Sequence, residues 1–150
     1  MRIGELAAAS GTPVETIRYY EREGLLPAPA RTEGNFRHYE PAHLERVKLI
    51  RQCRSLDMSL DEIRVLLEIR DGGADNCADV NALIDTHIGH VSARIRELRA
   101  LEKQLRELRQ HCCKPRSVDQ CGILAELTVA AQEPGAPARL GVHSSGVHSR

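Results

Sequence analysis

The stretch from about Asp79 to Gln110 constrains the fold more than any other part of the sequence. It contains no proline and a single glycine, and its apolar residues recur at a step of seven: Ile84, Val91, Leu98 and Leu105. This pattern predicts one helix of about 30 residues, about 45 Å long. A chain of 150 residues cannot bury a narrow apolar stripe on so long a rod. The sequence therefore predicts a partner helix, most simply from a second copy of the chain, and hence a homodimer.

The segment before this rod predicts two short helices joined by a tight turn. The first, from about Ile3 to Ala9, ends at turn residues, and the second begins near Pro13, where Thr12 is expected to cap it. The second helix is expected to stop at Gly24. Two such helices with a glycine between them form a helix-turn-helix unit.

A wing and two further helices are expected to complete this domain. The dipeptide Gly34-Asn35 lies between short alternating segments and predicts a β-hairpin. One helix opens at Pro41, and Ser59 with Glu62 forms a capping box for another. Aromatic residues make up only 3% of the chain, which favours packed helices. The predicted fold is all-α with a small β-wing: a winged helix-turn-helix domain followed by a long antiparallel coiled-coil helix.

A helix-turn-helix with a wing and a dimerising rod is an arrangement that binds promoter DNA, with the second helix in a major groove. The formal net charge is zero, so no global field attracts a polyanion, and binding must come from local cations. The alternative is an ordinary helical domain in which the tyrosines are core or surface residues. The candidate DNA-binding residues are Thr16, Arg18, Tyr19, Tyr20, Arg22, Arg31, Arg37 and Tyr39.

Two segments resemble the signature of MerR-type transcriptional regulators: Arg18-Tyr19-Tyr20-Glu21-Arg22-Glu23-Gly24-Leu25-Leu26-Pro27, and Arg31 with Asn35-Phe36-Arg37-His38-Tyr39. The resemblance covers most of the chain, with Asn35-Phe36-Arg37 where the family usually has Gly-Tyr-Arg. It implies a regulator that holds RNA polymerase at a promoter and activates transcription by bending and untwisting the operator.

Four cysteines flank the rod: Cys77 before it, and Cys112, Cys113 and Cys121 beyond it. About 50 Å of helix separates the two groups within one chain. In an antiparallel dimer, Cys77 of the partner subunit can join Cys112 and Cys121, with Cys113 as a possible fourth ligand. Thiolates favour Cd²⁺, Pb²⁺, Hg²⁺ and Zn²⁺. The alternative for these residues is buried, inert cysteine, as expected for Cys53.

The resemblance narrows the expected metal. Family members that sense monovalent copper-group ions are similar to one another in carrying Ser where this chain has Cys77, so a divalent ion is implied. The segment after Cys77 and the Cys121-Gly122 ending look most like the cadmium- and lead-responsive regulators, which activate heavy-metal resistance and efflux genes. The alternative is a zinc-responsive regulator of a zinc efflux gene, which the Cys112-Cys113 pair also resembles.

A second, nitrogen-ligand metal site is a further hypothesis, built from His87 and His90 on the rod with His143 and His148 near the C-terminus. Solvent-facing histidines are the alternative. The boundaries predicted for the chain are a DNA-binding domain over 1–71, a dimerisation helix over 76–111, a metal-binding loop and short helix over 112–128, and a disordered His-containing tail over 129–150.

Enzymatic and redox roles are expected to be absent. A zinc hydrolase needs a pocket with a general base, an iron–sulfur switch needs four clustered cysteines, and a multidrug-binding regulator needs a ligand domain after the rod. No segment predicts a membrane span or a signal peptide, so we expect a cytoplasmic protein.

Overall fold

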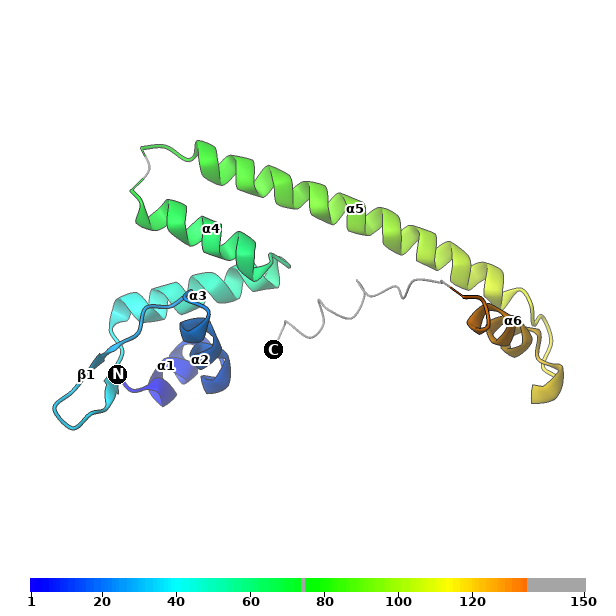
Figure 1. Cartoon of the computed structure of the whole chain (residues 1–150), viewed down its shortest axis with the longest axis horizontal. Coiled ribbons are helices and arrows are strands. Elements are labelled where there is room, and N and C mark those ends of the chain that lie inside the picture. The colour runs from blue at the N-terminus through cyan, green and yellow to red at the C-terminus, as the bar shows by residue number, and fades with distance from the viewer. Residues whose placement is uncertain (74, 135–150) are drawn as a thin grey trace. The chain divides into compact units, whose positions relative to one another are not determined.

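The computed structural model describes residues 1–73 and 75–134, which fall into two compact units, residues 1–83 and 84–134. The elements are almost all helical, with one two-stranded antiparallel sheet, as the sequence predicts (Figure 1). No helix in the described part of the chain is long and apolar enough to cross a membrane. In chain order the elements are α1 (Ile3–Ser10), α2 (Val14–Arg22), β1 (Ala30–Arg31), β2 (Arg37–His38), α3 (Pro41–Ser55), α4 (Leu60–Asp71), α5 (Ala78–Arg109), η1 (Val118–Gln120) and α6 (Gly122–Ala131).

The turn between α1 and α2 forms the predicted helix-turn-helix. α1 ends at Gly11, whose φ of 65° is left-handed and whose N–H bonds to the Ala7 carbonyl. The expected cap by Thr12 is wrong: its hydroxyl donates to the Ser10 carbonyl at 3.4 Å. Pro13 is instead the N-cap residue of α2, with no side-chain hydrogen bond. The first turn of α2 therefore lacks a side-chain cap.

The wing is the predicted β-hairpin. Ala30 lies opposite His38, and Arg31 lies opposite Arg37. The turn closes through a hydrogen bond of 2.8 Å from the Asn35 N–H to the Thr32 carbonyl, with Asn35 at a φ of 63°. An asparagine tolerates this left-handed conformation better than most residues.

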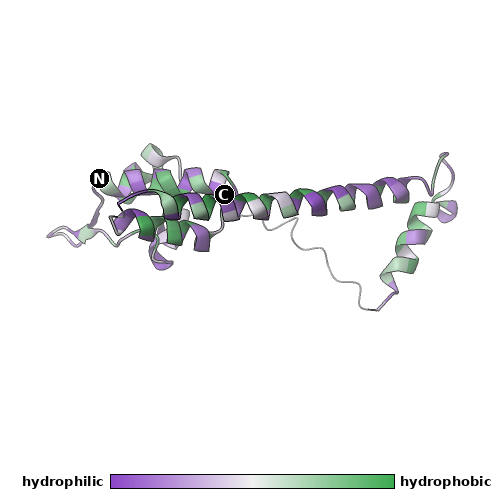
Figure 2. Cartoon of the chain, turned by 90° about the horizontal axis from the view of Figure 1, so that it is seen from above, coloured by the Kyte–Doolittle hydropathy of each residue, from purple (hydrophilic) through white to green (hydrophobic). Residues whose placement is uncertain are grey.

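Helices α3 and α4 complete the first unit. Glu62 N–H donates to Ser59 Oγ at 3.1 Å and Ser59 N–H donates to Glu62 Oε1 at 2.9 Å, which is the predicted capping box. Side chains from α1, α2, α3 and α4 and from the segment after α2 form one apolar core. Figure 2 shows that the ribbons of these helices alternate between hydrophobic and hydrophilic residues. Its fully buried members include Leu6, Ile17, Leu25, Leu26, Val47, Ile50, Met58, Ile63 and Leu67.

Helix α5 is continuous over 32 residues, or about 48 Å. It matches the predicted rod to within one residue at each end. None of its residues is buried within the chain, and the four residues of the seven-residue repeat are 36% to 55% exposed. A row of large apolar side chains is thus left accessible along the rod.

The segment after α5 is a loop containing η1 and then α6. The sequence predicts a loop and short helix over 112–128 with a disordered tail from 129, whereas α6 continues to Ala131. In its last turn the Thr128 hydroxyl donates to the Leu124 carbonyl at 2.7 Å. Most of α6 is coloured hydrophobic in Figure 2. His143 and His148 lie outside the described residues.

Candidate nucleic-acid interface and metal centre

Helix α2, the second helix of the helix-turn-helix and hereafter the recognition helix, meets the wing at a cluster of arginines. Arg18, Arg22 and Arg37 line a recess of about 410 Å³ together with Glu21. Arg18 and Arg22 are exposed, and Arg18 forms a pair with Glu15 at 3.3 Å. Three cations around one recess can contact an anionic backbone, since only one carboxylate in the lining opposes them.

Glu21 ties the wing to α2. Its Oε2 accepts a hydrogen bond of 2.6 Å from Arg37 Nη1, and its Oε1 accepts one of 2.5 Å from the Tyr39 hydroxyl. Burial, and then the hydrogen bond to Glu21, raise the pKa of Tyr39 above its ordinary value. This network fixes β2 against the recognition helix.

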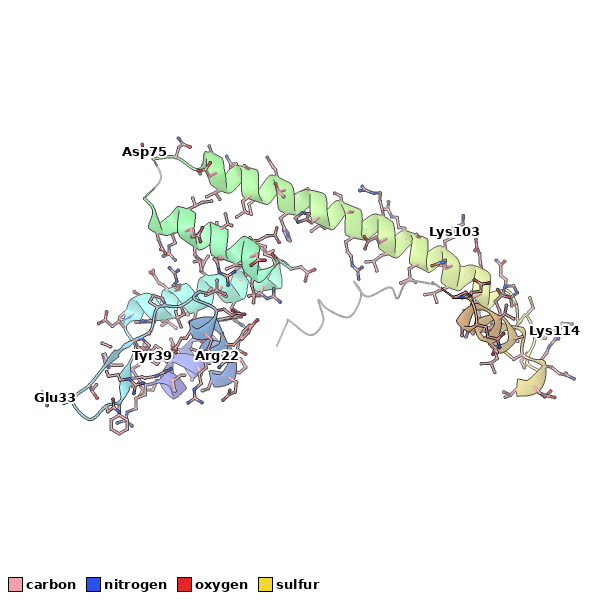
Figure 3. All side chains as sticks on the ribbon, in the orientation of Figure 1. Arg22, Glu33, Tyr39, Asp75, Lys103 and Lys114 are labelled. Atoms are coloured by element: carbon pink, nitrogen blue, oxygen red, sulfur yellow. The ribbon has the colours of Figure 1, made fainter. Side chains whose placement is uncertain are left out.

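The structure separates the predicted DNA-binding residues into two groups. Tyr19, Arg18, Arg22 and Arg31 are exposed, and Thr16 and Arg37 are half-buried. Tyr20 is 6% exposed and Tyr39 is 1% exposed, so both belong to the core. Tyr20 still lines a recess of about 750 Å³ beside α3, and the Tyr39 hydroxyl donates to Glu21, so a role of these two tyrosines in DNA binding stays a prediction. In Figure 3, Tyr39 and Arg22 lie in the body of the unit, and Glu33 lies at the tip of the hairpin.

The exposed face of the wing carries two further contacts. Arg31 Nη1 donates to the carbonyl and the side-chain oxygen of Asn35, each at 3.3 Å. The Arg2 guanidinium lies 4.2 Å from the centre of the Phe36 ring, which is 51% exposed. Phe36 stands where the pattern noted above usually has a tyrosine. It therefore presents an aromatic ring without a hydroxyl, with the Arg2 guanidinium against the ring.

Cys112, in the loop after α5, lies close enough to Cys121, at the start of α6, to influence its ionisation. Cys121 is the N-cap residue of α6, and its side chain makes no cap hydrogen bond. Its pKa is lowered first by the backbone N–H of Leu124, and further by that of Ile123, by the Cys112 side chain and by the charge of Arg116. Burial raises it and is the second-largest of these effects. Backbone N–H groups at a helix N-terminus favour an anion. The thiolate form of Cys121 is thus favoured more than that of an ordinary cysteine.

Cys113 points differently from Cys112, although the two are adjacent in sequence. The Cys113 thiol donates to the Gln110 carbonyl at 3.3 Å, back toward the end of α5, and the Cys112 thiol contacts the Lys114 carbonyl at 3.4 Å. Lys114 is labelled in this loop in Figure 3. Within the described residues, the loop pairs Cys121 with Cys112 and leaves Cys113 outside the pair.

Cys77 is exposed and immediately precedes α5. Asn76 accepts the Ala78 N–H at 2.9 Å, which caps the helix, and Asn81 Nδ2 lies 3.9 Å from the Cys77 sulfur. The whole of α5 separates Cys77 from Cys112 along the chain. Cys53, by contrast, is buried at 5% exposure in the core, and burial raises its pKa, as expected for a packing residue.

Gly122 is a site residue that our sequence reasoning missed. A Cβ built at this position would overlap the His111 carbonyl oxygen and lie 3.3 Å from the His111 Cβ. The loop can therefore return to the end of α5 only because residue 122 has no side chain. No turn motif in the sequence marks this glycine. The one available signal is that it directly follows Cys121.

His87 and His90 share one face of α5. Their ring centres are 6.4 Å apart and the rings are nearly perpendicular, at 86°. Because His143 and His148 lie outside the described residues, the four-histidine site stays a prediction.

Comparisons with known proteins agree with this architecture. The family described as MerR HTH family regulatory protein matches residues 1–69, and the one described as MerR, DNA binding matches residues 44–108. A ZntR homolog of Haemophilus influenzae, named as an HTH-type transcriptional regulator, is 49% identical over 110 residues, or 73% of this chain and 82% of the homolog. The mercuric resistance operon regulatory protein of Bacillus cereus is 36% identical over 126 residues, or 84% of this chain and 96% of that protein.

A solved structure extends the similarity to three dimensions. The transcription regulator PbrR691 of Ralstonia metallidurans CH34, crystallised in complex with lead(II), is 54% identical, with a TM-score of 0.75. The match covers 85% of this chain and 98% of that one. The matched relatives are transcription regulators and not enzymes, which removes the hydrolase alternative. On the strength of these matches and of its winged helix-turn-helix, the chain belongs to the MerR family of helix-turn-helix regulatory proteins.

Proposed function

We propose that this protein is a metal-sensing transcriptional regulator that binds a promoter operator as a homodimer. On binding Cd²⁺ or Pb²⁺ it activates heavy-metal resistance or efflux genes. The observation that carries the proposal is the pairing of Cys112 with a Cys121 whose pKa is lowered at the start of α6. A second support is the 54% identity to a regulator crystallised with lead(II).

The donor set fits a soft divalent ion. Two sulfur atoms lie together in one loop, and Cys77 of the partner subunit would supply a third. Soft thiolate ligands select thiophilic metals over Mg²⁺ or Ca²⁺, and three of them suit a trigonal ion such as Pb²⁺. The pKa of Cys121 is lowered by backbone N–H groups, so fewer protons compete with the metal there than at an ordinary cysteine.

The dimer follows from the rod. The seven-residue repeat of α5 is accessible along its whole length in one chain, and pairing with a second rod would bury it. An antiparallel arrangement would bring the start of one α5 beside the end of the other. That arrangement would complete the ligand set, because Cys77 precedes α5 and Cys112 and Cys121 follow it.

Activation would act through the shape of the operator. The arginines of α2 and the wing would bind DNA both with and without metal. RNA polymerase would be bound at the promoter before the metal arrives. Metal binding can activate only if it favours one of two DNA-bound conformations over the other. The loop at Cys121 and the exposed apolar residues of α6, such as Leu124 and Leu127, are the parts that closure around a metal would rearrange.

A zinc-responsive regulator of a zinc efflux gene is the second candidate. Zn²⁺ prefers four ligands, and Cys113 lies next to Cys112 with its thiol held only by the Gln110 carbonyl at 3.3 Å. Rotation of this side chain would offer a fourth sulfur. A loss of Zn²⁺ response in Cys113→Ser with an unchanged Pb²⁺ response would favour this candidate.

Transcription in vitro tests the proposal. In Cys112→Ser and Cys121→Ser, we expect operator affinity within about twofold of wild type and no transcription in response to Cd²⁺ or Pb²⁺. Cys53→Ala is the control, since it removes a thiol outside the loop without burying a hydroxyl in the core, and it should retain the response. Metal-dependent transcription that survives both loop substitutions would refute the proposal.

A further inference from the structure

One arginine side chain of α3 joins the end of α4 to the segment that follows the recognition helix. Arg46 donates from Nε to the Leu25 carbonyl at 2.6 Å. Its Nη1 donates to both carboxylate oxygens of Asp71, each at 3.0 Å. Asp71 is the last residue of α4. Arg46 therefore contacts two segments that are distant in the sequence, and we call these contacts the Arg46 anchor.

The Arg46 side chain is shielded from water. It is 17% exposed, whereas the Asp71 side chain is 55% exposed. A cation this far from water needs its acceptors, because a buried charge without partners is costly. The guanidinium group is planar, and its N–H groups have a fixed arrangement. The position of one acceptor therefore sets the position of the other.

Leu25 belongs to the end of the recognition helix by its hydrogen bonds. Its N–H donates to the Tyr20 carbonyl at 2.9 Å, and its side chain is fully buried. Between the helix and Leu25 lies Gly24, whose φ of 74° is left-handed. A second arginine, Arg64 of α4, donates from Nη2 to the Glu23 carbonyl at 2.9 Å. The end of the recognition helix is thus tied through its backbone carbonyls to α3 and α4.

The last turn of α4 depends on side-chain contacts at its surface. Leu67 is the last residue of this helix that is buried in the apolar core. Two of the described ion pairs reach the last turn, Arg46 with Asp71 at 3.0 Å and Arg70 with Glu45 at 3.7 Å. The Arg70 side chain is 47% exposed, so its pair is both longer and wetter. The Arg46 anchor is therefore the stronger of the two attachments.

The chain leaves the DNA-binding domain for the rod directly after this anchor. Gly72 follows α4, and Gly73 has a left-handed φ of 65°. A Cβ on Gly73 would meet no atom within 4 Å, so packing does not hold this position. Helix α5 begins at Ala78 (Figure 1). Along the backbone, a movement of the rod thus reaches the domain at the last turn of α4.

We propose that Arg46 is a positioning residue for activation, which makes the recognition helix follow the end of α4 when metal binds. It acts through Leu25 and Asp71 and contacts neither the metal nor the DNA. Coupling between two sites is carried by packed side chains and hydrogen bonds that connect them, and the Arg46 anchor is such a connection. The inference rests on the proposed function, because it requires a metal-driven change at the rod.

Asp71→Asn tests the anchor with little risk to the fold, since this side chain is 55% exposed. The full-length protein is measured on an operator with 2-aminopurine at its centre, whose fluorescence rises when base stacking is lost. Cd²⁺ should change this signal in the wild type. In Asp71→Asn, we expect the metal-free operator affinity to stay within about threefold of wild type. The responses of fluorescence and of transcription in vitro to Cd²⁺ should fall at least about fivefold.

Three further variants separate the anchor from a general loss of charge. Asp61→Asn is the matched control, because the pair of Asp61 with Arg64 at 2.7 Å lies within α4, and it should retain the response. Asp71→Glu keeps the carboxylate and should restore most of the response. Arg46→Lys keeps the charge but replaces the guanidinium by a single ammonium, so it should behave like Asp71→Asn. Wild-type responses in both Asp71→Asn and Arg46→Lys would overturn the inference.

A Cd²⁺ titration of the free protein separates this inference from the proposed function. Thiolate-to-metal absorption should give the wild-type Cd²⁺ affinity in Asp71→Asn, because Asp71 lies outside the cysteine site. A clearly weaker Cd²⁺ affinity would mean that the substitution disturbs metal binding itself, and the positioning role would be wrong. A wild type that binds Cd²⁺ without any change in operator fluorescence or transcription would overturn the proposed function, and this inference with it. Wild-type circular dichroism and melting temperature show that a variant is folded, and Asp71→Asn decides the test should Arg46→Lys unfold.

Discussion

Arg37 of the wing and Glu21 of the recognition helix are joined by an ion pair of 2.6 Å, in which the Glu21 side chain is only 9% exposed. Residues 16 apart in sequence thereby hold two DNA-binding elements in one orientation. The Tyr39 hydroxyl donates a hydrogen bond to the other carboxylate oxygen of Glu21. The wing is short, with two residues in each strand, so this side-chain network supplies much of its attachment.

Replacing Glu21 should therefore loosen the wing. In Glu21→Gln, we expect a loss of about 1–3 kcal/mol of unfolding free energy, because the amide keeps one oxygen for two donors, turns an N–H₂ donor toward the other and removes the negative charge opposite Arg37. Operator affinity should fall as well. Urea unfolding and fluorescence anisotropy measure the two effects. The matched control is Glu15→Gln, whose pair with Arg18 is exposed, and its unfolding free energy should change by less than about 0.5 kcal/mol.

The buried tyrosines predict a loss of stability in alkali. Burial raises the pKa of Tyr39, so the folded state keeps its proton while the unfolded chain releases it. The contribution of Tyr39 to the unfolding free energy should stay constant below about pH 10. It should then fall as the pH rises toward the pKa of Tyr39 in the folded state. Urea titrations between pH 8 and 11 measure the slope. Tyr39→Phe should have a shallower slope than wild type, and equal slopes would contradict the account.

Closure of the loop depends on the missing side chain at position 122. In Gly122→Ala, the new methyl group would overlap the His111 carbonyl, so Cys121 should move away from Cys112. We expect Cd²⁺ affinity to fall at least tenfold while operator binding stays at the wild-type level. Gly4→Ala is the control, because a Cβ there meets no atom within 4 Å. Unchanged Cd²⁺ affinity in Gly122→Ala would show that the loop does not need this close approach.

Alkylation should distinguish the cysteines by environment. The pKa of Cys121 is lowered by the backbone N–H groups of α6, so in the metal-free protein it should react with iodoacetamide at lower pH than an ordinary thiol. Cys53 is buried and its pKa is raised, so it should resist modification until the domain unfolds. Mass spectrometry of tryptic peptides reads each site. In urea the two cysteines should react alike, and a difference that persists there would have another cause than the fold.

Most of the helices could be predicted from the sequence, because the patterns that determine them lie within single segments. The capping box of Ser59 and Glu62 and the seven-residue repeat of α5 lie within single segments, and both elements form where expected. The cap by Thr12 failed because its hydroxyl bonds instead to the Ser10 carbonyl of the turn. The sequence named Arg37 and Tyr39 as DNA-binding candidates on the wing, but it could not show that the Tyr39 ring is buried in the core.

The remaining site residues could not be predicted, because they depend on contacts between segments that are distant in the sequence. Lys48, Arg51 and Arg54 stand at a step of three in the sequence, but the recess of about 750 Å³ that they line exists only because α3 packs beside the turn that joins α1 to α2. Gly122 gave no turn signal, since what requires a glycine there is the approach of a backbone carbonyl from residue 111. Such constraints arise between segments, and periodicity within one segment cannot reveal them.

A metal titration of the reduced, metal-free dimer tests the central claim most directly. Thiolate-to-metal charge-transfer absorption follows Cd²⁺, Pb²⁺ and Zn²⁺ in the wild type and in Cys77→Ser. The account predicts one tight site per subunit, which is lost or strongly weakened in Cys77→Ser, together with a rank order that identifies the inducer. Binding of wild-type tightness in Cys77→Ser would contradict it, because the loop would then hold the metal without the partner subunit.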